Sequence, residues 1–182
     1  NNMRKLGFDF YAPEKELIPL IREYAQTKGL DFKILGAAQK NQQYLERQFF
    51  AEILGDVALE QVLIANDTVD SYQICDQSLV VIGVDSSLLY EALGRGKKTL
   101  FYSARVGDER FVSKRFGWPW HGDSEGPFWI NGPEPQLAIE KIDRLIKLGA
   151  SDWVSVLEIA DSAYCQWRSL DGLCFNLNGE FK

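Results

Sequence analysis

Hydrophobic and polar positions alternate between helical and strand-like spacing over the first hundred residues. Longer segments repeat apolar residues every three or four positions, and short β-branched or aromatic runs separate them. This alternation predicts an α/β fold, a Rossmann-like parallel sheet with helices on both faces. Pro19 falls inside the first helical pattern, so we expect the first turn of that helix to be separate or kinked. The expected helices span 13–28, 42–54 and 69–76, and the expected strands span 6–10, 32–35, 62–65, 79–84 and 99–102.

The second half of the chain has a different pattern. Residues 104–135 are rich in Gly, Pro, Trp and Phe without a clear period, which predicts a long irregular loop of the kind that is usually functional. Helical spacing resumes over 137–148 and again over about 151–168. We expect residues 1–182 to form a single Rossmann-like domain, which is one lobe of something larger or a natural short version of it.

Asp85, Ser86 and Ser87 occupy the most informative position in this pattern. They follow the apolar run 79–84 and precede a short helical segment, so they form the first turn of a strand–helix–strand unit. Ligands of parallel sheets bind at such turns, and the first amides of a helix favour an anion. We therefore expect a phosphate at Ser86 and Ser87, with Glu91 one turn later accepting the hydroxyls of a ribose. The alternative is that Ser87 only caps the helix.

Charge is distributed unevenly along the chain. The formal net charge is −6, yet segment 95–115 carries seven basic residues against two acidic ones. The overall acidity disfavours nucleic acid as a partner, whereas the basic segment would attract an anionic small molecule. A solvated loop is the alternative interpretation. Arginine can contact phosphate or carboxylate with two parallel hydrogen bonds. The candidates for such contacts are Arg105, Arg110, Lys114 and Arg115.

Histidine and cysteine usage restricts the remaining chemistry. His121 is the single histidine, and the three cysteines have no metal-like spacing, so we expect no metal site and no cofactor. His121 lies among aromatic and acidic residues and could act as a base or phosphate ligand. The alternative is a small aromatic core that fixes the loop. No apolar run reaches the length of a membrane span, which fits a cytoplasmic protein, with a peripheral contact at the inner membrane face as a further expectation.

Residues 86–98 read Ser-Ser-Leu-Leu-Tyr-Glu-Ala-Leu-Gly-Arg-Gly-Lys-Lys. This segment resembles a signature in the C-terminal lobe of GT-B-fold glycosyltransferases, closest to capsule and O-antigen enzymes such as the β-Kdo transferases. The Phe-Gly-Trp-Pro run at 116–119 and the Gly-Pro-Phe-Trp run at 126–129 are similar to the loop that follows this unit in surface-carbohydrate proteins. The similarity covers residues 70–132, about a third of the chain.

The resemblance implies a lobe that binds a nucleotide-activated sugar, with Ser86 and Ser87 at the phosphate and Glu91 near the ribose. It also implies a glycan or lipid-linked acceptor. The acceptor-binding lobe of such enzymes is not in this sequence, and their His-Pro motif is missing, since Gly122 follows His121. The sequence therefore assigns no catalytic residue. Two alternatives stay open: a non-catalytic Rossmann-like module that binds a ligand or partner, and a protein similar to nucleotide-sugar epimerases.

Overall fold

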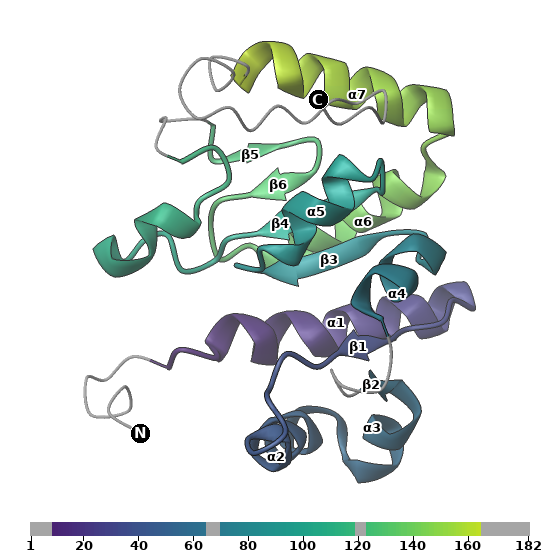
Figure 1. Ribbon diagram of the computed structural model, residues 1–182, viewed down its shortest axis with the longest axis vertical. Helices are drawn as coiled ribbons and strands as arrows, with labels where there is room; N and C mark the ends of the chain where they lie inside the picture. Colours follow the sequence, from purple (N-terminus) through teal and green to yellow (C-terminus); the bar gives the residue numbers. More distant parts are fainter. Residues whose placement is uncertain (1–8, 65–69, 119–122, 165–182) are drawn as a thin grey trace. The chain divides into compact units, whose positions relative to one another are not determined.

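Helices alternate with short parallel strands along the chain, which confirms the α/β, Rossmann-like class predicted from the sequence (Figure 1). The structure is a computed structural model and describes residues 9–64, 70–118 and 123–164. The chain divides into two units, residues 1–77 and 78–182, and each unit is described by itself.

The first unit begins with helix α1 (Ala12–Lys28), whose apolar face is buried. Leu17, Ile21 and Ala25 lie on this face at helical spacing. Gly29 ends the helix in the left-handed conformation, with φ 66°, and its amide donates to carbonyls of the last turn. The helix therefore buries apolar positions that its sequence pattern predicts to lie on one face.

The rest of the first unit consists of β1 (Ile34–Leu35), α2 (Gln43–Leu54), α3 (Asp56–Val62), β2 (Leu63–Ile64) and α4 (Ser71–Gln77). Strands β1 and β2 pair in parallel. A carboxylate of α2 holds the loop after β1, because Oε1 of Glu46 accepts hydrogen bonds from the amides of Ala37 (2.8 Å) and Ala38 (3.1 Å). Leu54, Ala58 and Leu59 are buried at the junction of α2 and α3.

The second unit is built on a four-stranded sheet of β3 (Val81–Val84), β4 (Thr99–Tyr102), β5 (Glu125–Gly126) and β6 (Trp129–Ile130). The strand order is β3-β4-β6-β5, in which β5 alone is antiparallel to its neighbour. Strand β4 is central and entirely buried. Because β3, β4 and β6 are parallel, their carboxyl ends meet at one edge of the sheet, where ligands bind in open α/β sheets.

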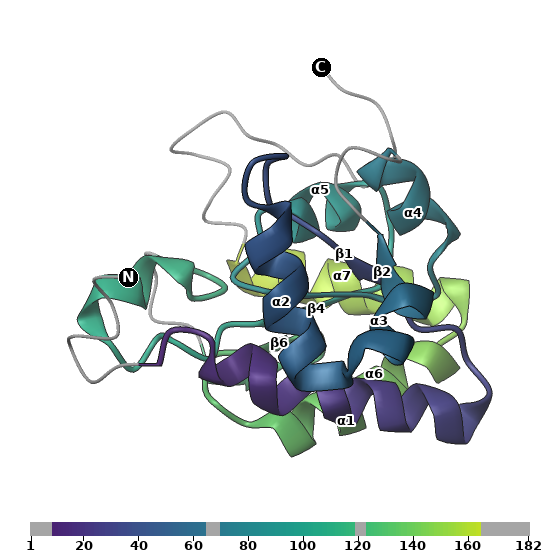
Figure 2. The ribbon, with the colours of Figure 1, turned by 90° about the horizontal axis from the view of Figure 1, so that it is seen from below.

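Helices cover both faces of this sheet, and they are α5 (Leu88–Gly94), α6 (Pro135–Lys147) and α7 (Ala150–Tyr164). Figures 1 and 2 show α5 on one face and α6 on the other. The buried side of α6 carries Ala138, Ile142 and Leu145. In α7, Trp153 and Leu157 are buried, so apolar positions of the helical pattern predicted over about 151–168 belong to the core.

A buried cation connects the β5–β6 hairpin to α6. Lys141 is 5% exposed, and its Nζ donates to the carbonyl of Gly126 (2.7 Å) and pairs with Oε2 of Glu125 (2.8 Å). The hydrogen bond from Lys141 lowers the pKa of Glu125 below its ordinary value. The hairpin is thus stabilised by Lys141 of α6 as well as by the hydrogen bonds between β5 and β6.

Several expectations are corrected by the structure. Segment 104–135, expected to be irregular, contains strands β5 and β6 and the 3₁₀ helix η2 (Glu109–Lys114). Its aromatic and glycine-rich composition gives no strand pattern at β6. This strand is defined by its pairing with β4, which lies about 30 residues earlier in the chain. The separate first turn expected at Pro19 is also wrong, since α1 is continuous. Helix α3 was not predicted.

Some expectations lie wholly or partly outside the described residues. The strand expected over 6–10 and the helix expected beyond residue 164 belong to this group. Among the helices that the structure describes, none has both the length and the apolar composition needed to cross a bilayer.

Candidate functional site

Asp85 follows strand β3 and lies at the carboxyl edge of the sheet. Its backbone adopts φ 54°, a left-handed conformation that Asp tolerates better than most residues. The turn is tight because Gly83 lets α5 approach: a Cβ at Gly83 would meet the Leu89 side chain at 2.9 Å. The strand-to-helix turn therefore directs the carboxylate of Asp85 inward rather than toward solvent.

A buried ion pair joins this turn to the segment after β4. Nη1 of Arg105 lies 2.5 Å from Oδ2 of Asp85, and the two side chains are 2% and 9% exposed. The second carboxylate oxygen of Asp85, Oδ1, is also buried and has no hydrogen-bond partner among the described residues. The structure thus places Asp85 and Arg105 together, with the guanidinium facing an internal carboxylate.

Ser86 and Ser87 lie next to this pair in the turn, and both are exposed. Ser87 is the N-cap residue of α5, but its hydroxyl makes no cap hydrogen bond. Capping by the Ser87 side chain, the alternative interpretation of the sequence, is therefore not observed. The two hydroxyls are available to a ligand at the edge of the sheet. Because α5 is only seven residues long, hydroxyls and Arg105 are better candidates than the helix dipole for holding an anion.

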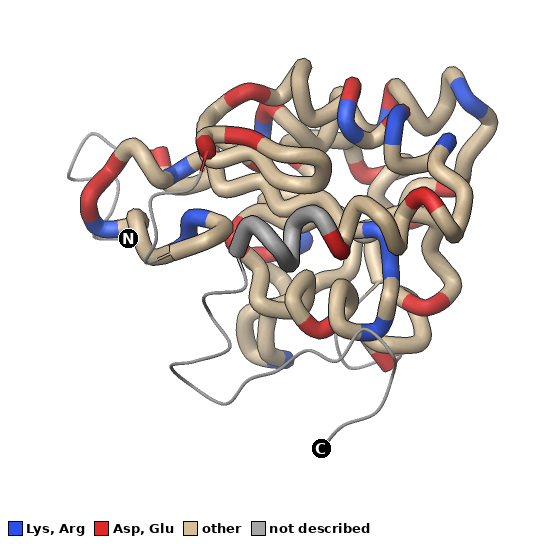
Figure 3. The backbone as a smooth tube through the Cα atoms, turned by 90° about the horizontal axis from the view of Figure 1, so that it is seen from above, with Lys and Arg blue, Asp and Glu red and all other residues tan. Residues whose placement is uncertain are grey.

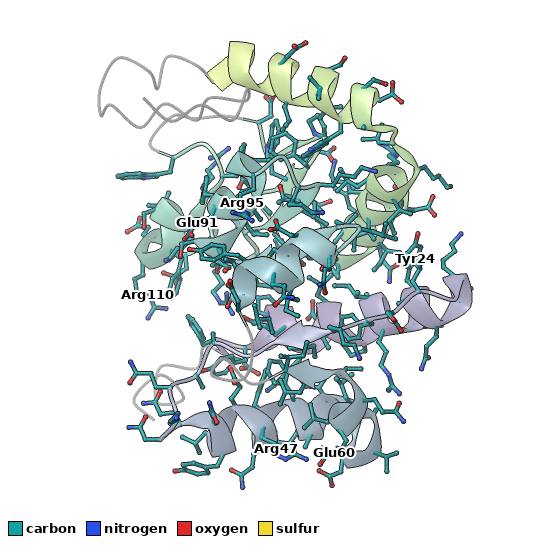
Figure 4. All side chains as sticks on the ribbon, turned by 45° about the vertical axis from the view of Figure 1, so that its right-hand side comes forward. Tyr24, Arg47, Glu60, Glu91, Arg95 and Arg110 are labelled. Atoms are coloured by element: carbon teal, nitrogen blue, oxygen red, sulfur yellow. The ribbon has the colours of Figure 1, made fainter. Side chains whose placement is uncertain are left out.

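Glu91 lies on the first turn of α5 and is exposed. Figure 4 shows Glu91, on α5, close to Arg95, the residue that directly follows this helix; Arg110 lies on η2. The carboxylate is on the same short helix as Ser87, as predicted. A ribose contact of Glu91 stays a prediction.

Ser103 and Asn131 are further polar residues at this edge, and sequence reasoning missed both. Ser103 follows β4, is 2% exposed, and donates from Oγ to the carbonyl of Lys114 at 2.8 Å. Asn131 follows β6 and is 9% exposed. Each is the first polar residue after an apolar strand, the signal that had singled out Asp85. All three parallel strands therefore end in a buried polar side chain.

Asn131 holds both ends of the loop that contains His121. Its carboxamide oxygen accepts from the amide of Phe116 at 2.9 Å. Its Nδ2 donates to the carbonyls of Phe116 (3.1 Å) and Asp123 (3.2 Å). His121 itself lies outside the described residues, so its predicted role as a base or phosphate ligand is untested.

Aromatic rings fix the same loop from the side of the core. Phe116 stacks on Trp129, with ring centroids 4.9 Å apart, and contacts Phe101 and Phe128. Of the four aromatic residues that the sequence analysis considered around His121, Phe128 and Trp129 belong to this buried cluster, and Trp120 lies outside the described residues. Trp118 is not part of its buried portion, since it is 46% exposed.

The remaining arginine candidates lie on the loop between β4 and β5. Arg110 is exposed, and its Nε donates to Oδ1 of Asp108 at 2.9 Å. This hydrogen bond lowers the pKa of Asp108 to about 2. Arg115 follows η2 and is half-buried. Acidic and basic positions are mixed along the described backbone (Figure 3). Arg105 and Arg110 each pair with an Asp, so part of the basic charge near the site is internally compensated.

The site therefore combines exposed hydroxyls, a buried guanidinium and a carboxylate at the carboxyl ends of parallel strands. Such a set can bind an anion and orient a polar ligand. Within the described ranges, no group of three or more His, Cys, Asp or Glu side chains is arranged to hold a metal ion.

Comparison with known proteins links the chain to surface-carbohydrate synthesis. A family model described as "putative O-antigen biosynthesis protein" matches residues 1–165. The search of curated proteins finds no match, and neither does the search of solved structures. The matched range contains the whole candidate site, from Asp85 to Asn131.

Proposed function

The chain belongs to this family of O-antigen biosynthesis proteins, and from that premise we propose that its second unit binds a nucleotide-activated sugar. The protein would be the donor-binding part of a glycosyltransferase in surface-polysaccharide synthesis. The acceptor would be a glycan or a lipid-linked glycan, reached in the cytoplasm at the inner face of the membrane. A second lobe or partner protein would supply the acceptor site.

The observation that carries this proposal is the arrangement at the carboxyl edge of β3 and β4. Two exposed serines, Ser86 and Ser87, directly follow Asp85, whose carboxylate pairs with the buried Arg105. Hydroxyls and a guanidinium are the donors that a diphosphate needs. In the proposed reaction they stabilise the negative charge that develops as the nucleotide leaves, a form of electrostatic preorganisation.

Glu91 would bind the ribose, and residues of the loop after β4 would complete the site. A carboxylate can accept hydrogen bonds from two adjacent hydroxyls. Arg110, Arg115 and His121 are the proposed contributors from the surrounding loop, and Asp85 in the turn would act through its pair with Arg105. The resemblance of residues 86–98 to the glycosyltransferase signature supports this assignment of roles.

The test is a thermal-shift screen of the full chain against CMP, UDP, GDP and sugar nucleotides of cytidine and uridine. A ligand present at a hundred times its Kd stabilises the folded protein by about 2.7 kcal/mol, which a melting scan detects. We expect one nucleotide class to raise the melting temperature. The double variant Ser86→Ala/Ser87→Ala should lose this shift.

The matched control is Ser151→Ala/Ser155→Ala, which removes two exposed hydroxyls from α7, away from the β3–α5 turn. It should bind the nucleotide like the unmodified protein. If no nucleotide shifts the melting temperature, the donor-site proposal is wrong, and the non-catalytic module becomes the better interpretation. A shift that survives in the Ser86/Ser87 variant would place the nucleotide elsewhere.

A further inference from the structure

We propose that Asp85 is an internal competitor for the ligand: its carboxylate holds Arg105 in the ligand-free protein, and the phosphate of the ligand displaces it. The inference rests on the proposed function, since it concerns regulation of the same site. It predicts that the affinity for anions is set by how strongly Asp85 holds the guanidinium.

The first support is that Asp85 is poorly satisfied where it lies. Its side chain is 9% exposed, and one of its two oxygens is buried without a hydrogen bond among the described residues. A buried acceptor without a donor loses its hydration and receives nothing in exchange. The bound arrangement of Asp85 is therefore one that a better ligand can displace.

The second support is the character of Arg105. The guanidinium is 2% exposed, so the pair with Asp85 is formed away from water, where an uncompensated charge is costly. Without a ligand, the protein must therefore keep an anion of its own at this position. A phosphate group meets the same requirement and offers more acceptor oxygens than a carboxylate, with two-point geometry for a guanidinium.

The third support is the location of the pair. Asp85 precedes Ser86 and Ser87, which are exposed, so outward rotation of Asp85 would open Arg105 toward the two hydroxyls. A phosphate bound there would then contact both the buried Arg105 guanidinium and the hydroxyls of Ser86 and Ser87. An internal competitor weakens binding in a defined way. The apparent Kd rises as the fraction of molecules in which Asp85 has released Arg105 falls.

Asp85→Asn tests this competition, with inorganic pyrophosphate as the probe. Asparagine tolerates the left-handed backbone but has no charge, so the Asp85 carboxylate no longer neutralises Arg105. We expect a lower melting temperature in chloride buffer, restored by pyrophosphate. We also expect the Kd for pyrophosphate, measured by calorimetry at constant ionic strength, to fall at least tenfold.

Asp85→Gly is the second variant, because glycine removes the carboxylate and accepts φ 54° without strain. The control is the double variant Asp85→Asn/Arg105→Gln, which has no buried charge at the pair and should gain nothing from pyrophosphate. If both Asp85 variants bind pyrophosphate no more tightly than the unmodified chain, or fail to fold with or without it, the inference is wrong. Asp85 would then be a structural partner of Arg105.

The outcome is separable from that of the proposed function. Nucleotide binding that weakens in the Asp85 variants would overturn the competition and leave the donor site intact. Tighter pyrophosphate binding without binding of any nucleotide would support the competition and contradict the nucleotide-sugar proposal.

Discussion

Three residues that follow the parallel strands are buried and polar, and they differ in how their hydrogen bonds are satisfied. Ser103 and Asn131 donate to loop carbonyls, so they fasten the chain that returns over the edge of the sheet. Asp85 instead faces Arg105 and keeps one oxygen without a donor. Fully satisfied buried groups give rigidity, whereas a partly satisfied group is open to a new partner. The edge thus combines two satisfied polar groups with one that keeps an unused acceptor.

Asn131→Ala should destabilise the second unit by about 2–3 kcal/mol, because it removes a buried carboxamide together with its three hydrogen bonds to the backbone of Phe116 and Asp123. Urea denaturation followed by tryptophan fluorescence measures the change. Gln136→Ala is the matched control, since it truncates another carboxamide side chain, one that is exposed on α6. It should lie within about 0.5 kcal/mol of the unmodified protein. An equal effect of both variants would contradict the role given to Asn131.

At the scale of elements, the β5–β6 hairpin depends on a close contact between Gly126 and Trp129. A Cβ at Gly126 would lie 2.0 Å from the indole of Trp129, which is itself 4% exposed and has no room to move freely. We expect Gly126→Ala to cost about 1–3 kcal/mol through overpacking. Gly107→Ala is the control, because a Cβ there meets nothing within 4 Å. Thermal denaturation of both variants should show a lower melting temperature for the first alone.

Sequence patterns located the elements around the site because their signals are local. Strand β4 matches its predicted bounds, and α5 begins directly after the predicted turn, since apolar runs, serines and glycines mark these boundaries within a few residues. Strand β6 has only two residues and is defined by pairing with β4, which no local pattern encodes. The predicted site residues Asp85 and Arg105 do meet, but their burial and pairing depend on a tertiary contact between segments 20 positions apart.

At the scale of the whole molecule, the second unit has its own core. Its sheet carries Leu100, Tyr102 and Ile130, and α5 and α6 cover both faces. We therefore expect a fragment of residues 78–182 to fold without the first unit. Cooperative urea unfolding, together with retained pyrophosphate or nucleotide binding, would check this expectation. A fragment that unfolds without a transition would show that the two units share a core.

The hydrogen bonds of Asn131 to Phe116 and Asp123 have a consequence for how loop length can vary in this protein family. Both ends of segment 117–122 are fastened to one carboxamide, so the sheet does not depend on the number of residues between them. Lengthening a closed loop is inexpensive, about 0.6 kcal/mol for each doubling. Insertions should therefore accumulate at this position before they accumulate in the β3–α5 turn. Changes in the length of this segment would therefore leave the carboxyl edge of β3, β4 and β6 as it is.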